Sequence, residues 1–153
     1  DELPNLVLTK FPLDQEKQSI MGHSMGGLGA LNIAIRNPEI YKTVSAFAPI
    51  SNPTKGIWGQ KQFEAYLGKK TENWKKYDPS ILLNEQGYKG KILIDQGTKD
   101  DFLKNLMPEA LEKIFNNRNN GDQLRYQKDY DHSYFFVSSF LKDHVLWHKD
   151  NVK

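Results

Sequence analysis

GHSMG, at residues 22–26, decides the fold because it fits G-x-S-x-G, the pattern of a sharp turn between a strand and a helix. Before it, Ser19–Gly22 is a short apolar run typical of a strand, which Gln18 would extend by one residue. From Met25 onward, apolar residues recur at helical spacing until the Asn37-Pro38 pair ends the helix. The pattern therefore occurs in the strand–turn–helix context that it requires.

Strands and helices alternate along the rest of the chain. The clearest strand is KILIDQG, at residues 91–97. The other predicted elements are a weak helix over 3–10, strands over 43–49 and 123–130, and helices over 104–118 and 133–147. Such alternation predicts an α/β fold of the α/β-hydrolase type, with a mostly parallel sheet flanked by helices on both faces. Residues 51–88 contain no strong strand, and we expect them to form an insertion of short helices over the sheet edge.

Ser24 is the candidate nucleophile, because this turn lifts a serine hydroxyl above the sheet. Side chains at Gly22 or Gly26 are expected to collide with the neighbouring strand and helix. The serine lies at a helix N-terminus, where negative charge is favoured, so the backbone N–H of Met25 is a natural oxyanion donor. The alternative is a glycine-rich turn in which Ser24 only caps the helix.

A serine hydroxyl needs a base, and four histidines are available. His23 lies inside the turn, too close along the chain to act as the base for Ser24. His144 and His148 stand four residues apart on the last predicted helix; no carboxylate or thiol clearly completes a metal site with them, so we expect surface histidines. His132 directly follows the last predicted strand, where α/β-hydrolases carry their base.

The acid that orients the base should follow the strand at 91–97, because the chain order in α/β-hydrolases is serine, acid, histidine. Asp100 and Asp101 come next, and either could reach His132. One of the two could instead cap a helix starting at residue 102. Asp95 lies within the strand and is a weaker candidate, better suited to an internal hydrogen bond.

Composition limits the other function classes. The 153 residues suit one soluble, globular domain, with 38% hydrophobic and 26% charged residues. A net charge of +2 is too small to indicate binding to nucleic acid or to an anionic membrane. The absence of cysteine excludes disulfides, thiolate metal sites and a cysteine nucleophile. No apolar run approaches the roughly 20 residues that cross a bilayer.

Beyond the turn, the chain resembles the S-formylglutathione hydrolases, also called the esterase D family. The resemblance is carried, in the family's order, by GHSMGGLGAL (22–31), YKTVSAFAPISNP (41–53), WGQKQFEAYLG (58–68), ILIDQGTKDDFL (92–103) and YDHSYFFVSSFLKDH (130–144). GHSMGG is shared by many esterases, whereas SAFAPI-x-NP, DQG-x-x-D-x-F-L and YDHSY together are far more specific. The resemblance implies Ser24 as nucleophile, Asp100 as acid and His132 as base.

The resemblance further implies hydrolysis of the thioester S-formylglutathione to glutathione and formate, a step of formaldehyde detoxification. It implies no metal, no organic cofactor, a cytoplasmic location and a possible homodimer. We place His23 and Trp58 in the substrate pocket. Tyr66 and Trp74 are further aromatic candidates for its wall, although these aromatic residues could equally pack the insertion onto the sheet.

The match covers only the C-terminal half of the family's domain, and the chain begins with Asp1 rather than methionine. We therefore expect it to be part of something longer, with the second oxyanion donor outside it. Two alternatives remain open. The chain could belong to a general short-chain carboxylesterase or acyltransferase of the same fold, or it could be a catalytically incompetent fragment.

Overall fold

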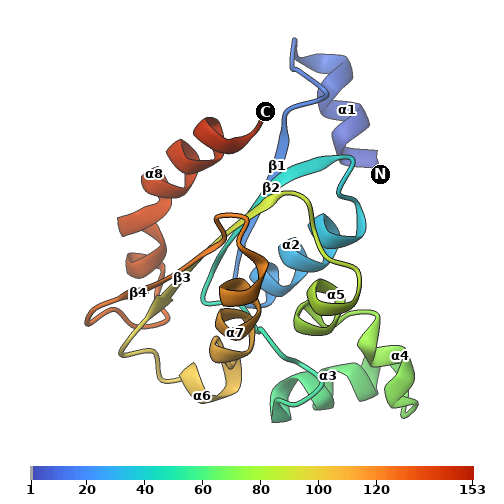
Figure 1. Cartoon of the computed structure of the whole chain (residues 1–153), viewed down its shortest axis with the longest axis vertical. Helices are drawn as coiled ribbons and strands as arrows, with labels where there is room; N and C mark the ends of the chain where they lie inside the picture. Colours follow the sequence, from blue (N-terminus) through green and yellow to red (C-terminus); the bar gives the residue numbers. More distant parts are fainter. Residues whose placement is uncertain (1) are drawn as a thin grey trace.

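A parallel sheet of four strands runs through the centre of the molecule (Figure 1). The computed structural model describes residues 2–153 of the chain. The strands stand in the sheet in their order along the chain, and every neighbouring pair is parallel. They are β1 (Gln18–His23), β2 (Tyr41–Phe47), β3 (Lys91–Gly97) and β4 (Gln123–Gln127). All four strands therefore end on the same side, where the segments that follow them meet.

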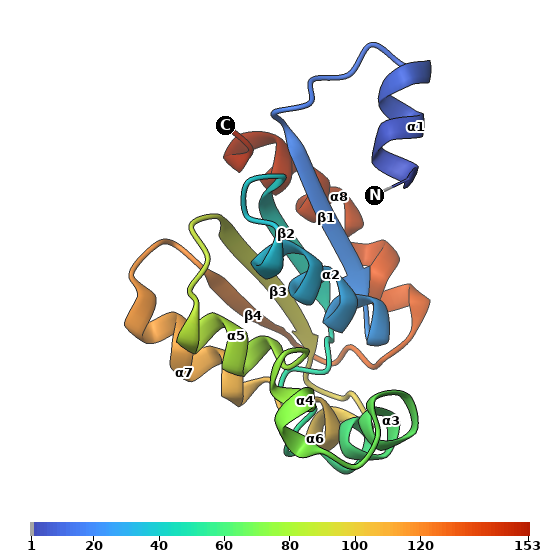
Figure 2. The same cartoon turned by 90° about the vertical axis from the view of Figure 1, so that its right-hand side faces the viewer.

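Helices cover both faces of this sheet, as the sequence predicts (Figure 2). One face carries α2 (Met25–Arg36), α5 (Pro79–Glu85) and α7 (Glu109–Arg118), and the other carries α8 (Tyr134–Asn151). Three further helices lie beyond the carboxyl ends of the strands: α3 (Ile57–Leu67), α4 (Thr71–Lys75) and α6 (Leu103–Leu106). The predicted fold class is thus confirmed, with β4 at one edge.

Residues 51–88 form α3, α4 and α5, but not as a layer over an edge strand. The first two of these helices lie at the carboxyl end of the sheet, and α5 packs against α2 and α7. The buried carboxylate of Asp78 starts α5 by accepting hydrogen bonds from the amides of Ser80 and Ile81. Its other oxygen accepts the Thr54 hydroxyl at 2.7 Å. One side chain thereby ties the loop before α3 to the start of α5.

Three predicted boundaries move, each next to a residue with a positive φ. The predicted helix 104–118 is two helices, because Met107 has a φ of 54° and Pro108 has no amide to donate. The second strand ends before Ala48, whose φ is 43°, and the fourth ends before Asp129, whose φ is 66°. Left-handed residues interrupt regular hydrogen bonding, so each element stops there.

Two apolar clusters hold the layers together. The larger lies between the sheet and the helices α2, α5 and α7, and its fully buried members include Leu31, Ala34, Val44, Ala46, Ile92, Ile94 and Leu111. The smaller joins the carboxyl ends of the strands to the start of α8, through Leu28, Phe47, Ala48, Ile50, Leu106 and Phe136. The second cluster therefore lies directly beneath the turn that carries Ser24.

Under α8 the sheet is polar. His144 and His148 point inward and are only 0% and 6% exposed, so the prediction of surface histidines is wrong. The ring nitrogens of His148 lie 2.6 Å from the Thr43 hydroxyl and 2.8 Å from the Ser45 hydroxyl. Nε2 of His144 lies 3.3 Å from the carboxylate of Asp95. Because β2 and β3 supply these polar partners, imidazole rings can be buried where an apolar side chain would otherwise be expected.

Stability is expected to fall in acid because of His148. Burial, and secondarily the neighbouring His144, lower the pKa of His148 to about 4, against about 6.5 in the unfolded chain. Between these two values the unfolded chain binds a proton that the folded chain does not, so the free energy of unfolding drops as the pH falls. The loss between pH 7 and pH 4 should be about 3 kcal/mol.

Urea unfolding of the wild type and of His148→Gln at pH 7 and pH 4 measures this loss. Glutamine keeps hydrogen-bonding groups beside Thr43 and Ser45 but does not titrate. The variant should therefore lose less stability than the wild type over this range. Equal losses in the two proteins would contradict the assignment.

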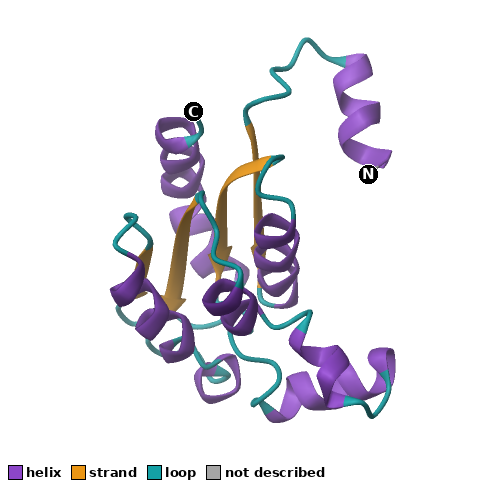
Figure 3. Ribbon diagram, turned by 45° about the vertical axis from the view of Figure 1, so that its right-hand side comes forward, coloured by secondary structure: helices purple, strands orange, loops and turns teal. Residues whose placement is uncertain are grey.

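The first helix, α1 (Glu2–Lys10), stands apart from the sheet (Figure 3). Its presence confirms the predicted helix over 3–10, and none of its residues is buried. Residues 11–17 connect it to β1, which forms the other edge of the sheet. Within residues 2–153, no helix is both long and apolar enough to cross a membrane.

Candidate active site

Ser24 occupies a strained turn between β1 and α2. Its φ of 56° and ψ of −116° lie where non-glycine residues are rarely found. Its amide donates to the carbonyl of Phe47 at 2.9 Å, and its own carbonyl accepts the amide of Leu28 at 3.0 Å. Strained backbone persists only where its surroundings fix it, and it is concentrated at functional sites. The turn has the form that G-x-S-x-G predicts.

Close packing around the turn explains two of its glycines. A Cβ at Gly22 would lie 2.1 Å from the carbonyl oxygen of Gly26, and a Cβ at Gly27 would lie 2.9 Å from the side chain of Pro49. At Gly26 itself a Cβ would meet nothing within 4 Å, so the expected collision at that position is wrong. The chain approaches itself closely at residues 22 and 27, while residue 26 faces open space.

Replacing Gly22 with alanine should destabilise the fold by about 3 kcal/mol or more, because the clashing atoms belong to the backbone and cannot move aside. Gly26→Ala adds the same methyl group where there is room, and should leave stability unchanged or slightly higher. Urea unfolding of the two variants and the wild type compares them directly. A Gly22→Ala protein as stable as Gly26→Ala would show that the turn relaxes easily.

Asp100 and His132 are joined by a short hydrogen bond. Nδ1 of His132 lies 2.7 Å from Oδ2 of Asp100, while Oδ1 of Asp100 accepts the amide of Phe102 at 2.8 Å. Burial raises the pKa of Asp100, but hydrogen bonds from His132 and Phe102 outweigh it and the pKa lies below its usual value. An ionised carboxylate only accepts, so Nδ1 carries the proton and Nε2 is left free to act as a base. The neighbouring Asp101 is exposed.

The loops that carry this pair are joined by backbone contacts. The amide of Thr98 donates to the carbonyl of Gln127, and the amide of Lys99 donates to the carbonyl of Tyr130. A Cβ at Gly97 would lie 2.4 Å from that same carbonyl oxygen of Tyr130, so glycine permits the close approach. The segment after β3 is therefore held against the segment after β4, which places the acid next to the base.

Aromatic rings surround His132 on two sides. The ring of His23 lies 4.6 Å from it, and the ring of Phe102 lies 5.1 Å from it, edge to face. Trp58 packs against Phe102 at 4.9 Å, so α3 reaches the base through one intervening ring. Burial, and a positive charge on His132, lower the pKa of His23, while Asp100 raises it. Of the two predicted pocket residues, His23 thus lies beside the base, and Trp58 lies one ring further away, on Phe102.

His23 also connects the two halves of the site, since it directly precedes Ser24 and contacts His132. Among residues 2–153, no hydrogen bond joins the Ser24 hydroxyl to His132. In serine hydrolases without substrate this bond is often long and shortens when substrate binds. Met25 begins α2, so its amide has no acceptor within the helix and is available to an oxyanion.

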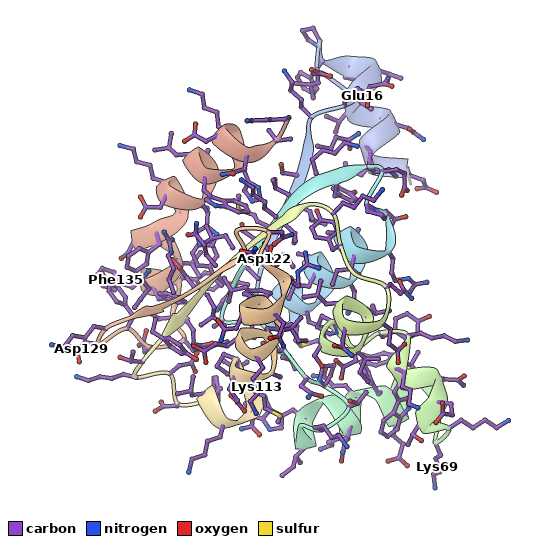
Figure 4. The ribbon with its side chains drawn as sticks, viewed as in Figure 1. Glu16, Lys69, Lys113, Asp122, Asp129 and Phe135 are labelled. Atoms are coloured by element: carbon purple, nitrogen blue, oxygen red, sulfur yellow. The ribbon has the colours of Figure 1, made fainter. Side chains whose placement is uncertain are left out.

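The remaining aromatic candidates lie further away. Trp74 is buried under α3, where it packs on Phe63 and donates its Nε1–H to the carbonyl of Gly68. Tyr66 is 83% exposed. Trp74 therefore packs the inserted helices together, as the alternative interpretation proposes. Phe135, at the start of α8, is exposed and lies at the outside of the molecule (Figure 4).

An apolar groove of about 510 Å³ begins at Met25 and follows α2 to Arg36. Its other wall is formed by α3 and includes Phe63 and Tyr66. At the end of the groove nearest Ser24, the amide of Gln62 on α3 lies 3.6 Å from the sulfur of Met25. Tyr66 thus lines a groove along α2 and not the surroundings of His132.

Sequence reasoning missed two residues of the site, Gln96 and Phe102. Gln96 is fully buried and donates to Oδ2 of Asp100 at 3.0 Å. Both residues lie within the stretch 92–103 that carries the resemblance, which was the available signal. Neither stands out by composition, because a glutamine in a strand and a phenylalanine after an acidic pair have no specific chemistry of their own.

Comparisons with known proteins show which family the chain resembles. The chain is 54% identical over 151 residues to the S-formylglutathione hydrolase of Paracoccus denitrificans, a match that covers 99% of this chain and 54% of that protein. It thus spans about half the length of this curated relative. Among solved structures, an S-formylglutathione hydrolase from Agrobacterium tumefaciens superposes with a TM-score of 0.92 at 42% identity, over 100% of this chain and 56% of that one.

A more distant structure, the Staphylococcus aureus fluorophosphonate-binding serine hydrolase FphF, has a TM-score of 0.78 at 22% identity, over 96% of this chain and 60% of that one. At that identity the likeness shows the fold alone. A family model described as "Putative esterase" matches residues 1–147. Because this match takes in nearly all of its 153 residues, the chain belongs to the esterase family and has the α/β-hydrolase fold.

Proposed function

We propose that Ser24, His132 and Asp100 form the catalytic triad of a serine hydrolase. The hydrogen bond between His132 and Asp100, at 2.7 Å, is the single observation that carries the proposal. It fixes the tautomer of the imidazole, so that Nε2 can take the proton of Ser24. The strained turn supports the proposal, because it presents the serine next to the residue that contacts His132.

The reaction is acyl transfer in two steps. His132 removes the hydroxyl proton of Ser24, whose oxygen attacks the acyl carbon, and the amide of Met25 donates to the oxyanion. The imidazolium gives this proton to the leaving thiolate or alkoxide, which departs as thiol or alcohol. Neutral His132 then takes a proton from a water molecule that attacks the acyl-enzyme, and returns that proton to the Ser24 oxygen as the acid is released. Asp100 stays ionised and stabilises the imidazolium. The steps use side chains and backbone alone, with a second oxyanion donor expected from the part of the domain that this chain does not span.

The proposed substrate is the thioester S-formylglutathione. Its support is the 54% and 42% identity to two S-formylglutathione hydrolases. A small acyl group is compatible with the aromatic rings near the base, since Phe102 packs edge to face on His132 and Trp58 packs on Phe102.

Comparing hydrolysis of S-formylglutathione with that of nitrophenyl acetate, together with labelling by a fluorophosphonate probe, tests this function. Labelling with a clear preference for the thioester is the expected result. Labelling with a preference for the nitrophenyl ester would indicate a general short-chain carboxylesterase. Absence of both labelling and turnover would show that the chain is catalytically incompetent by itself.

A further inference from the structure

Gln96 occupies a position where the pattern of its strand calls for an aliphatic side chain. Alternate residues of β3 face the same side of the sheet, and Ile92 and Ile94 face the apolar cluster beneath α2, α5 and α7. Gln96 is next in that series and, like both isoleucines, is 0% exposed. A carboxamide at the end of this apolar row needs an explanation other than packing.

The contacts of Gln96 converge on the acid. Its Nε2 donates to Oδ2 of Asp100 at 3.0 Å and lies 3.3 Å from the carbonyl oxygen of Gly97. Its Oε1 is buried and has no hydrogen-bond partner among the described residues. The ionised carboxylate accepts only, so the NH₂ group must face Asp100, and the orphaned oxygen cannot be relieved by turning the amide over.

A buried polar atom without a partner costs free energy, and methionine would fill the same space without that cost. Among residues 2–153, the one side chain that Gln96 nevertheless bonds is the acid beside His132. We infer that Gln96 is a positioning residue, which holds Oδ2 of Asp100 on the line to Nδ1 of His132. The inference rests on the proposed triad and adds a fourth member to it.

With Gln96 in place, three hydrogen bonds hold the Asp100 carboxylate. Oδ1 accepts the amide of Phe102, and Oδ2 accepts both Gln96 and His132. Other titratable groups near the pair include His23, whose ring lies 4.6 Å from that of His132, and the exposed Asp131, the residue before His132. Without Gln96, Oδ2 would accept a hydrogen bond from His132 alone, and Oδ1 from the amide of Phe102 alone. The carboxylate would then be freer to rotate out of line with Nδ1 of His132.

Three variants test this role: Gln96→Met, which removes the donor at similar volume, Gln96→Glu, which places a second carboxyl beside Asp100, and Ile94→Met as the matched control on the same face of the strand. The first readout is the NMR titration of His132, together with the downfield signal of its Nδ1 proton, which needs no turnover. The second is the rate of fluorophosphonate labelling and kcat/KM against pH.

Gln96→Met should weaken or broaden the Nδ1 proton signal and lower the labelling rate and kcat about tenfold with KM little changed, since one orienting hydrogen bond is lost. Gln96→Glu places a buried carboxyl beside the ionised Asp100, where it should keep its proton and donate to Oδ2, so it should retain more of the Nδ1 signal and the labelling rate than Gln96→Met. Ile94→Met should leave both readouts as in the wild type.

Gln96→Met and Gln96→Glu proteins whose His132 titration and Nδ1 signal match those of Ile94→Met would overturn the inference. If the wild type neither labels nor turns over, the proposed function fails, and the NMR comparison still decides the role of Gln96. If the wild type is active while the Gln96 variants match Ile94→Met, the positioning role alone fails.

Discussion

Ser24→Ala should lose about 10⁶-fold in kcat and should no longer be labelled by a fluorophosphonate probe, because the variant lacks the oxygen that forms the acyl-enzyme. The substitution should lower the rate of the chemical step and leave the fold unchanged. Alanine has the size to occupy the turn, and the backbone bonds of Ser24 to Phe47 and Leu28 do not use the hydroxyl. Stopped assays with S-formylglutathione and intact-mass measurement of labelling give the two readouts.

Ser139→Ala is the matched control for this experiment. Ser139 is exposed on α8, and its hydroxyl only donates to a carbonyl one turn earlier on the same helix. The control should retain activity within about twofold, as surface substitutions usually do. Persistent labelling of Ser24→Ala would place the nucleophile elsewhere in the chain.

Asp100→Asn is expected to lower kcat by about 10⁴-fold. An asparagine amide can donate to Nδ1 of His132, which would move the imidazole proton to Nε2 and leave no acceptor for the proton of Ser24. The fold should survive, because one side-chain oxygen can still accept the amide of Phe102. Pre-steady-state labelling measures the loss, and a raised rate at high pH would be consistent with a mis-protonated base.

Asp101→Asn is the control that separates geometry from charge. This exposed carboxylate is adjacent along the chain and has the same formal charge, yet it is Asp100 that bonds His132. The control should change kcat by about twofold or less. If Asp101→Asn and Asp100→Asn lowered kcat equally, simple loss of negative charge near the site would explain both results.

The sequence predicts the turn and its neighbours well because their signals are local. Glycine spacing identifies the turn around Ser24, and an aliphatic run identifies β3. Pro108 also indicates a break in the predicted helix 104–118, because proline has no amide to donate to the preceding turn. The helical spacing of the apolar residues on both sides of Pro108 favours one continuous helix instead. A proline inside a predicted helix should therefore be given more weight than the helical spacing of the apolar residues around it.

The buried histidines show what local patterns do not contain. Helical spacing correctly places His144 and His148 on one face of α8, but it does not say which face packs. The packed face here is polar because hydroxyls on β2 and the carboxylate of Asp95 lie beneath it. Gln96 was missed for the same reason, since its role depends on a residue that only the fold brings near.

The turn at Ser24 also has a dynamic consequence. The amide of Ser24 donates to the carbonyl of Phe47 at the end of β2, and the amide of Ala48, which follows that strand, donates in turn to the carbonyl of Asp95 on β3. These two backbone hydrogen bonds connect the carboxyl ends of β1, β2 and β3, and both donor residues, Ser24 and Ala48, have a positive φ. Opening this turn means detaching strand ends from one another, so its amide protons should exchange with solvent only in the slow, cooperative events that open the sheet.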